Sequence, residues 1–121
     1  MSKFTALKPI LYTKELKETV AFYTIVLGFE CIAFEEAWGW ASVIKDEVEI
    51  MLAIPNQHTP FDSSVFTGSL YISTDKVDEL WTKYKDICKV CYAPDNFEYG
   101  MREFAIYDNN GYLLQFGQQL D

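Results

Sequence analysis

Hydrophobic residues follow two different spacings along this chain, and both halves show the two spacings in the same order. In the first half, apolar residues separated by four, three and four positions form one face of a predicted helix: Leu16, Val20, Tyr23 and Leu27. Thr13 is placed to cap the start of this helix, and Gly28 is placed to end it. Short apolar or alternating runs predict strands at residues 7–13, 29–36, 38–44 and 48–54, with a turn at Asp46-Glu47.

The second half repeats this succession. Its predicted helix is capped by Thr74 or Asp75 and carries the apolar face Val77, Leu80, Tyr84 and Ile87. Strands are predicted at residues 68–74, 88–93, 101–107 and 112–118. The segment Asn109-Asn110-Gly111 joins the last two strands as a hairpin turn, because Asn and Gly both accept a positive φ.

The two halves align as a repeat, in which Trp38-Gly39-Trp40 corresponds to Tyr99-Gly100-Met101. The sequence therefore predicts an α+β protein with one domain over residues 1–121, built from two βαβββ modules. The modules span about 4–54 and about 68–118, and a linker at about 55–67 joins them. Strand alternation directs Met51 and the corresponding Gln115 away from the helices. Two curved mixed sheets with the helices outside would then enclose a cavity lined by such residues.

The chain is acidic: 10 Lys and Arg against 18 Asp and Glu give a net charge of −8. Such a surface repels phosphate backbones and anionic lipids, so we expect no nucleic-acid and no membrane partner, whereas a cationic partner is favoured. No apolar run approaches the roughly 20 residues that span a bilayer. The N-terminus lacks the apolar region of a signal peptide, and we therefore expect a cytoplasmic protein.

Residues suited to metal or nucleophilic chemistry are few. The three cysteines are an odd number, which argues against a disulfide framework. Cys88 and Cys91 have the spacing of a metal-binding pair, but residues three apart on a predicted strand face opposite ways. The only histidine, His58, lies in the predicted linker, so a Ser-His or Cys-His pair is not expected. Glu49 and Glu103 remain as candidate bases on predicted strands.

Two segments resemble a known superfamily. The opening segment PILYTKELKETVAFYTIVLGFE resembles the start of vicinal oxygen chelate proteins, the glyoxalase/bleomycin resistance/dioxygenase superfamily. The closing segment YGMREFAIYDNNGYLLQFGQ resembles their final hairpin and, more narrowly, that of the bleomycin-resistance branch, and the middle segment FEEAWGWASVIKDEVEIML fits this branch too. The resemblance implies the glyoxalase/bleomycin resistance fold of paired βαβββ modules, in agreement with the repeat.

Enzymes of the vicinal oxygen chelate superfamily hold a divalent metal with residues from the first and last strands of each module. The resemblance places these ligand positions at Lys8 or Pro9, Met51, Ser69 and Gln115, with Glu49 two residues away from one of them. Lysine is cationic, proline has no side-chain donor and methionine is a soft ligand. These residues do not supply the oxygen and nitrogen donors that a hard or borderline ion needs, so we expect no metal and no cofactor.

The resemblance implies a binding surface instead. In the bleomycin-resistance branch, aromatic and acidic residues of a dimer groove sequester a cationic ligand, and flat aromatic faces both stack on rings and attract cations. The positions that resemble its binding residues are Phe34, Trp40, Tyr71 and Tyr99. Together with further residues of the predicted cavity and its rim, the predicted ligand-binding set is Phe34, Trp38, Trp40, Glu49, Met51, Ser69, Tyr71, Tyr99, Arg102 and Gln115. Arg102-Glu103 also matches the Arg-Glu of the branch's final hairpin, which implies that the two pair structurally.

Three functions remain as hypotheses. The first is a metal-free homodimer without catalytic residues that binds a cationic, aromatic small molecule, with antibiotic resistance as one such role. The second is a metal-dependent enzyme of the glyoxalase, dioxygenase or thiol-transferase type. The third is an interaction module in which the aromatic residues only seal a dimer. The weak metal donors favour the first hypothesis.

Overall fold

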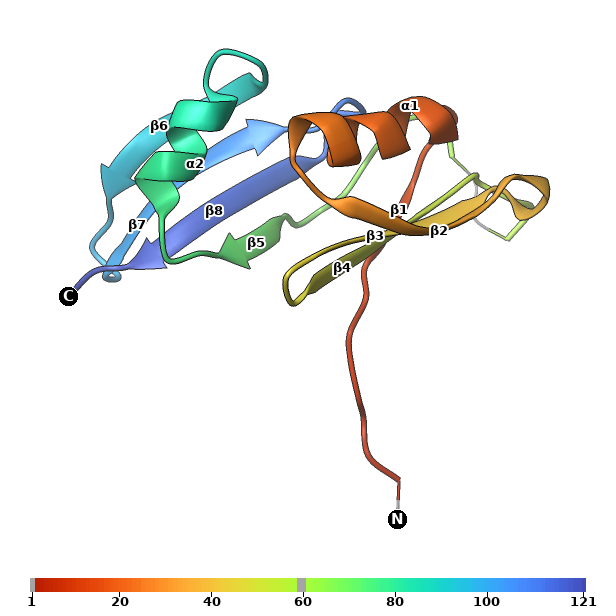
Figure 1. Ribbon diagram of the computed structural model, residues 1–121, viewed down its shortest axis with the longest axis horizontal. Coiled ribbons are helices and arrows are strands. Elements are labelled where there is room, and N and C mark those ends of the chain that lie inside the picture. The colour runs from red at the N-terminus through yellow and green to blue at the C-terminus, as the bar shows by residue number, and fades with distance from the viewer. Residues whose placement is uncertain (1, 59–60) are drawn as a thin grey trace. The chain divides into compact units, whose positions relative to one another are not determined.

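The computed structural model describes residues 2–58 and 61–121 and contains two compact units, one ending at Phe61 and the next beginning at Asp62. Each unit runs strand, helix and three further strands, and pairs its four strands in one mixed sheet with a helix across one face (Figure 1). The α+β class and the two βαβββ modules predicted from the sequence are confirmed. The boundary between the units falls inside the segment predicted as a linker.

The elements of the first unit are β1 (Ile10–Tyr12), α1 (Leu16–Ala21), a π-helical segment η1 (Phe22–Val26), β2 (Glu30–Glu35), a 3₁₀ turn η2 (Glu36–Trp38), β3 (Trp40–Lys45) and β4 (Val48–Ala53). The sheet order is β1-β4-β3-β2, with β1 parallel to β4 and the other pairs antiparallel. The N-cap residue of α1 is Glu15 and not the predicted Thr13. Thr13 Oγ1 accepts a hydrogen bond from the backbone N–H of Glu15 at 3.0 Å, in the turn just before the helix. Residues 2–7 extend away from this sheet (Figure 1).

The core of the first unit lies between its sheet and the α1–η1 helix. Its buried side chains come from the predicted helix face and from alternate strand positions: Leu11, Leu16, Tyr23, Leu27, Phe29, Ala41, Val43, Ile50 and Leu52. Burying a large apolar side chain of this kind contributes about 1.5–3 kcal/mol. Alternation therefore leaves the opposite face of the sheet to the polar and aromatic residues described below.

The elements of the second unit are β5 (Leu70–Ser73), α2 (Val77–Tyr84), β6 (Lys89–Asn96), β7 (Met101–Tyr107) and β8 (Leu113–Gln119). The sheet order is β5-β8-β7-β6, with β5 parallel to β8. The backbone N–H of Val77 at the start of α2 donates to Gln118 Oε1 on β8 at 2.9 Å, so a strand residue caps this helix. Among the described residues, no helix combines the length and apolar character needed to cross a membrane.

Aromatic rings fill the core of the second unit. Phe104 on β7 and Phe116 on β8 stack with ring centroids 5.2 Å apart, and Tyr84 and Trp81 of α2 pack on them. The prediction that Ile87 belongs to the buried helix face is wrong. The helix ends at Tyr84, and Ile87 lies beyond it with 59% of its surface exposed.

Both predicted turns are confirmed. The turn at Asn109-Asn110-Gly111 places Gly111 at a φ of 91°. Asp108 stabilises this turn, because its Oδ1 accepts the backbone N–H groups of Asn110 at 2.8 Å and Tyr112 at 2.9 Å. In the first unit the turn between β3 and β4 contains Asp46-Glu47.

Candidate functional site

The face of the second sheet opposite α2 carries a buried carboxylate surrounded by hydrogen-bond donors. Glu103 on β7 is only 2% exposed. Its Oε1 accepts hydrogen bonds from Tyr99 Oη at 2.6 Å and Tyr71 Oη at 3.0 Å. Its Oε2 accepts from the hydroxyl of Tyr92 and, at 3.4 Å, from Gln115 Nε2. We call the following residues the Glu103 cluster: Ser69, Tyr71, Tyr92, Tyr99, Glu103 and Gln115.

The cluster keeps its carboxylate ionised and its phenols neutral near pH 7. Burial of Glu103 opposes the charged form, but hydrogen bonds from Tyr92, Tyr99, Tyr71 and Gln115 outweigh it and lower the pKa of Glu103. Burial, the hydrogen bond to Glu103 and the negative charge of Glu103 raise the pKa of Tyr71 to about 12. The hydrogen bond to Glu103, burial and the same charge raise the pKa of Tyr99 to about 12. Burial and the bond to Glu103 also raise the pKa of Tyr92.

A glycine on β8 makes room for this arrangement. Gly117 is paired with Glu103 in the β7–β8 ladder, next to the path of the Tyr71 side chain. A Cβ atom added to Gly117 would lie 1.9 Å from Tyr71 Oη and 2.5 Å from its Cζ. Since non-bonded carbon atoms prefer about 3.5–4.0 Å, Tyr71 reaches the carboxylate only because position 117 has no side chain.

Phe97 extends the cluster into an aromatic surface. Its ring stacks on Tyr99 with centroids 5.5 Å apart and 12° between the planes, and it meets Tyr92 edge-on at 6.0 Å. Tyr71 and Tyr99 are 43% and 63% exposed. Accessible aromatic rings therefore lie over a buried negative charge.

Two predicted metal positions are part of this cluster. The Ser69 hydroxyl donates to Gln115 Oε1, and Gln115 Nε2 donates to Tyr92 Oη at 2.9 Å. The side chains at both positions are thus engaged in the hydrogen-bond network of the cluster.

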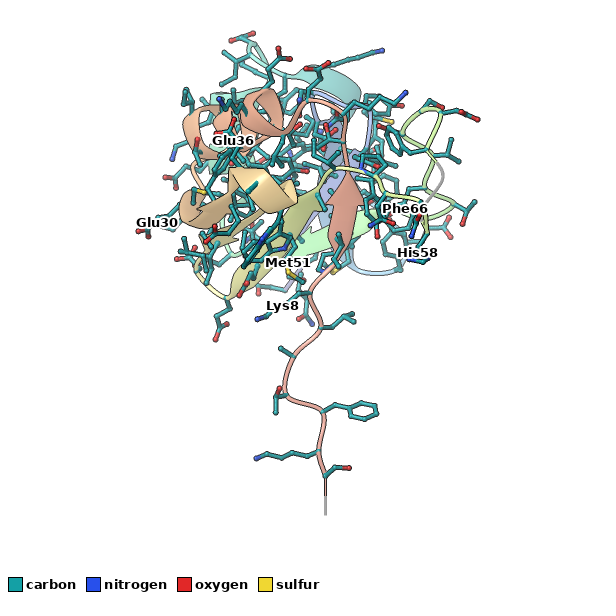
Figure 2. All side chains as sticks on the ribbon, turned by 90° about the vertical axis from the view of Figure 1, so that its right-hand side faces the viewer. Lys8, Glu30, Glu36, Met51, His58 and Phe66 are labelled. Atoms are coloured by element: carbon teal, nitrogen blue, oxygen red, sulfur yellow. The ribbon has the colours of Figure 1, made fainter. Side chains whose placement is uncertain are left out.

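In the first unit, strand pairing resolves the alternative between Lys8 and Pro9. Ile10 pairs with Met51, and residues two apart share a face of a strand, so Lys8 takes the metal position. Lys8 Nζ lies 3.6 Å from Glu49 Oε1. Figure 2 shows Lys8 and Met51 at the point where the N-terminal segment joins the sheet.

Two further side-chain contacts lie on this face of the first sheet. Glu49 Oε2 accepts the hydroxyl of Ser42 at 2.7 Å, and the indole N–H of Trp40 donates to Met51 Sδ at 3.4 Å. Three predicted ligand-binding residues, Trp40, Glu49 and Met51, are thus brought together on the sheet face opposite α1.

These donor sets do not fit a divalent metal. The first unit offers a cationic amine, a thioether and a carboxylate that is already paired, and the second offers a neutral hydroxyl and amide bonded to each other. Across residues 2–58 and 61–121, no group of three or more His, Cys, Asp or Glu is arranged to hold a metal ion. A hard or borderline ion needs three or four oxygen or nitrogen donors.

Phe34 does not share the surface of Trp40. Phe34 pairs with Ala41, whose side chain is buried under α1, so Phe34 lies on the helix side of the first sheet. There it lines an open groove of about 430 Å³ with the start of α1 and Glu36, which Figure 2 labels. Trp38 lies in η2 and is 78% exposed.

The expected pairing of Arg102 with Glu103 is wrong, because neighbouring strand residues point to opposite faces. Arg102 instead lies on the α2 side. Its guanidinium contacts Asp78 Oδ1 at 3.0 Å and Asn96 Oδ1 at 3.1 Å. Arg102 therefore connects β7 to α2 and does not join the Glu103 cluster.

Sequence reasoning missed Tyr92 and Phe97. Both lie on or next to β6, where the pairing register with β7 shifts between Val90 and Tyr92 and again between Tyr92 and Asp95. Because each irregularity breaks simple alternation, counting by twos along the sequence does not assign this face. Alternation does assign Glu103 to this face, because Glu103 is next to Phe104 on β7 and Phe104 points into the core.

The family model described as Glyoxalase/Bleomycin resistance protein/Dioxygenase superfamily matches residues 5–116. Comparison with curated proteins gives no match.

Several solved structures have a similar fold. A protein of unknown function from Agrobacterium tumefaciens str. C58 has a TM-score of 0.80 at 16% identity, covering 99% of this chain and 98% of that chain. A glyoxalase/bleomycin resistance protein/dioxygenase from Nocardioides has a TM-score of 0.78 at 16% identity, covering 100% and 87%. A lactoylglutathione lyase from Agrobacterium tumefaciens has a TM-score of 0.71 at 19% identity, covering 98% and 96%. At such identities the likeness establishes the fold alone, and the site residues must carry the argument on function.

Proposed function

We propose that this chain, which belongs to the Glyoxalase/Bleomycin resistance protein/Dioxygenase superfamily, is a metal-free binding protein for a cationic, aromatic small molecule. Membership of the superfamily does not separate an enzyme from a binding protein. The nature of the side chains on the two sheet faces favours binding.

The Glu103 cluster is the observation that carries this proposal. Its buried carboxylate stays ionised because four hydrogen bonds stabilise the charge. The rings of Tyr71 and Tyr99 are partly exposed above it. A cation over such rings gains about 0.5–2 kcal/mol from each favourable cation–π contact. The negative charge of Glu103 adds to this attraction. Its effect on a cation is stronger than in bulk water, because the carboxylate is buried in a medium of lower dielectric constant.

The first unit carries a patch of its own among the residues predicted to bind ligand. Trp40, Glu49 and Met51 lie together on one sheet face and offer an indole ring, a thioether and a carboxylate. Aromatic and thioether groups suit the flat apolar part of a ligand. We leave Phe34 and Arg102 out of the set, because both lie on the helix side of their sheets.

Bleomycin-type glycopeptides are one ligand of the required class, and sequestering such a drug between two copies of the chain would confer resistance. Tryptophan fluorescence and calorimetry of chelator-treated protein with metal-free bleomycin test this assignment. We expect saturable binding with a dissociation constant on the order of 10 µM or tighter. If bleomycin does not bind but other aromatic cations do, bleomycin is rejected as the ligand. Failure of every aromatic cation in a broad panel would reject the binding function.

A metal-dependent enzyme is the competing function, and it makes the opposite prediction about metal. We expect chelator treatment to leave the affinity for an aromatic cation unchanged, because the donor sets do not fit a divalent ion. Elemental analysis of the purified protein, with ligand titrations before and after added Mn, Ni, Zn or Fe, measures this. Stoichiometric metal retained after desalting would contradict the proposal.

A further inference from the structure

The donor hydrogens of the Glu103 cluster are all used within the cluster. The hydroxyl of Ser69 donates to Gln115 Oε1. Gln115 Nε2 carries two hydrogens and contacts Tyr92 Oη at 2.9 Å and Glu103 Oε2 at 3.4 Å. Tyr71, Tyr92 and Tyr99 each have a single hydroxyl hydrogen, and each donates it to Glu103.

The acceptors of the cluster are not all used. The Glu103 carboxylate has about four lone-pair sites and accepts four hydrogen bonds, so it is filled. A phenol oxygen that donates its hydrogen keeps lone pairs for an incoming donor. Tyr71 and Tyr99 are 43% and 63% exposed as whole residues, while the hydroxyl hydrogen of each points to Glu103. The solvent-facing side of the cluster therefore carries negative potential and phenol groups whose unused hydrogen-bonding capacity is for accepting.

We propose that Glu103 determines the specificity of this site by turning the tyrosine hydroxyl hydrogens inward, so that the site selects aromatic ligands bearing an N–H cation, such as an amidinium, and rejects aromatic carboxylates. The inference rests on the proposed binding function and names the ligand chemistry of that same site. Glu103 acts as a positioning residue, since it is buried and its own acceptors are filled. The hydroxyl oxygens and rings of Tyr71 and Tyr99 contact the ligand.

Four ring compounds of similar size separate the contribution of positive charge to binding from that of N–H donors: benzamidine, phenyltrimethylammonium, benzamide and benzoate. Benzamidine has charge and N–H donors, phenyltrimethylammonium has charge alone, benzamide has donors alone, and benzoate is an anion. NMR titration of the full chain measures affinities in the millimolar range, which suits ligands of this size. We expect benzamidine to bind best and benzoate worst.

The decisive variant is Glu103→Gln, which keeps the shape of the side chain and removes its charge. A neutral amide lets the phenol hydrogens turn outward, so benzamidine should bind about 10-fold to 100-fold more weakly, as expected for lost charge-assisted interactions. Benzoate should bind more strongly than it does to the wild type. The matched control is Glu79→Gln on α2, which makes the same charge change on the other side of the sheet and should keep the wild-type order.

The outcomes separate the two proposals. An unchanged benzamidine-to-benzoate ratio in Glu103→Gln overturns the role of Glu103 while leaving the binding function in place. Absence of binding by both aromatic cations to the wild type counts against the binding function itself. If near-ultraviolet circular dichroism shows that Glu103→Gln is not folded, Tyr99→Phe decides. Weaker benzamidine binding without stronger benzoate binding then supports the inference, and an unchanged affinity for benzamidine overturns it.

Discussion

The carboxylate of Glu103 accepts four hydrogen bonds and has a lowered pKa. A general base works best with a pKa near the operating pH and with a free lone pair aimed at its substrate. Glu103 meets neither condition, although its place on a strand made it a candidate base from the sequence. At the residue scale, its surroundings suit it to the role of a fixed anion.

The cluster makes stability depend on pH at both extremes. Glu103 contributes stability above the ordinary carboxyl pKa of 4.5, and this is lost as pH falls through its lowered pKa. Tyr71 and Tyr99 contribute stability below the ordinary phenol pKa of 10.0, and this is lost as pH rises toward about 12. Urea unfolding at a series of pH values measures the loss of stability at acid pH and at alkaline pH. We expect the stability difference between wild type and Glu103→Gln to shrink below pH 4.5, and a constant difference would contradict this.

Gly117 provides a second residue-scale prediction. Gly117→Ala should destabilise the protein by about 1–3 kcal/mol, because the new Cβ overlaps the Tyr71 ring and overpacking costs this much. Tyr71→Ser removes the ring, so Gly117→Ala should cost much less in that background. Chemical denaturation of the four proteins in this cycle measures the coupling. Additive effects would show that the two residues do not compete for the same space.

At the scale of elements, α2 depends on a cap that lies 41 residues away in sequence, on β8. Val77 is fully buried, so its N–H cannot turn to water if Gln118 is removed. Gln118→Ala should therefore cost about 1–3 kcal/mol, the range for an unsatisfied buried donor. Hydrogen exchange at Val77 and urea unfolding measure the effect. Gln119→Ala, at an exposed neighbouring position, is the control and should be near neutral.

At the scale of the whole molecule, the expectation is a homodimer. Large apolar side chains stay exposed within the single chain, among them Ile25 at 82%, Leu7 at 94% and Val65 at 77%. A homodimer would be supported if association covers some of these side chains, because contiguous exposed apolar patches mark association surfaces. Sedimentation should give about 28 kDa, which is twice the chain mass of 14.0 kDa. A mass of 14.0 kDa at the highest concentration, at both low and high salt, would reject the dimer.

The sequence by itself determined the elements and their order. Periodicity is a local property, so the spacing of Leu16, Tyr23 and Leu27 defined one helix, and alternation correctly put Ile50 and Leu52 in the core. The repeat then gave the two modules. The error at Ile87 arose because spacing continues past a helix end that backbone hydrogen bonding decides.

Only the tertiary structure decided the site. The Glu103 cluster joins side chains from β5, β6, β7, β8 and the β6–β7 connection, and its partners are separated by up to 46 residues in sequence. The irregular pairing of β6 hides Tyr92 from alternation, and the space above Gly117 exists only because β5 lies beside β8. Which acceptor each hydroxyl donates to depends on these long-range contacts, and the donor and acceptor character of the surface depends on them in turn.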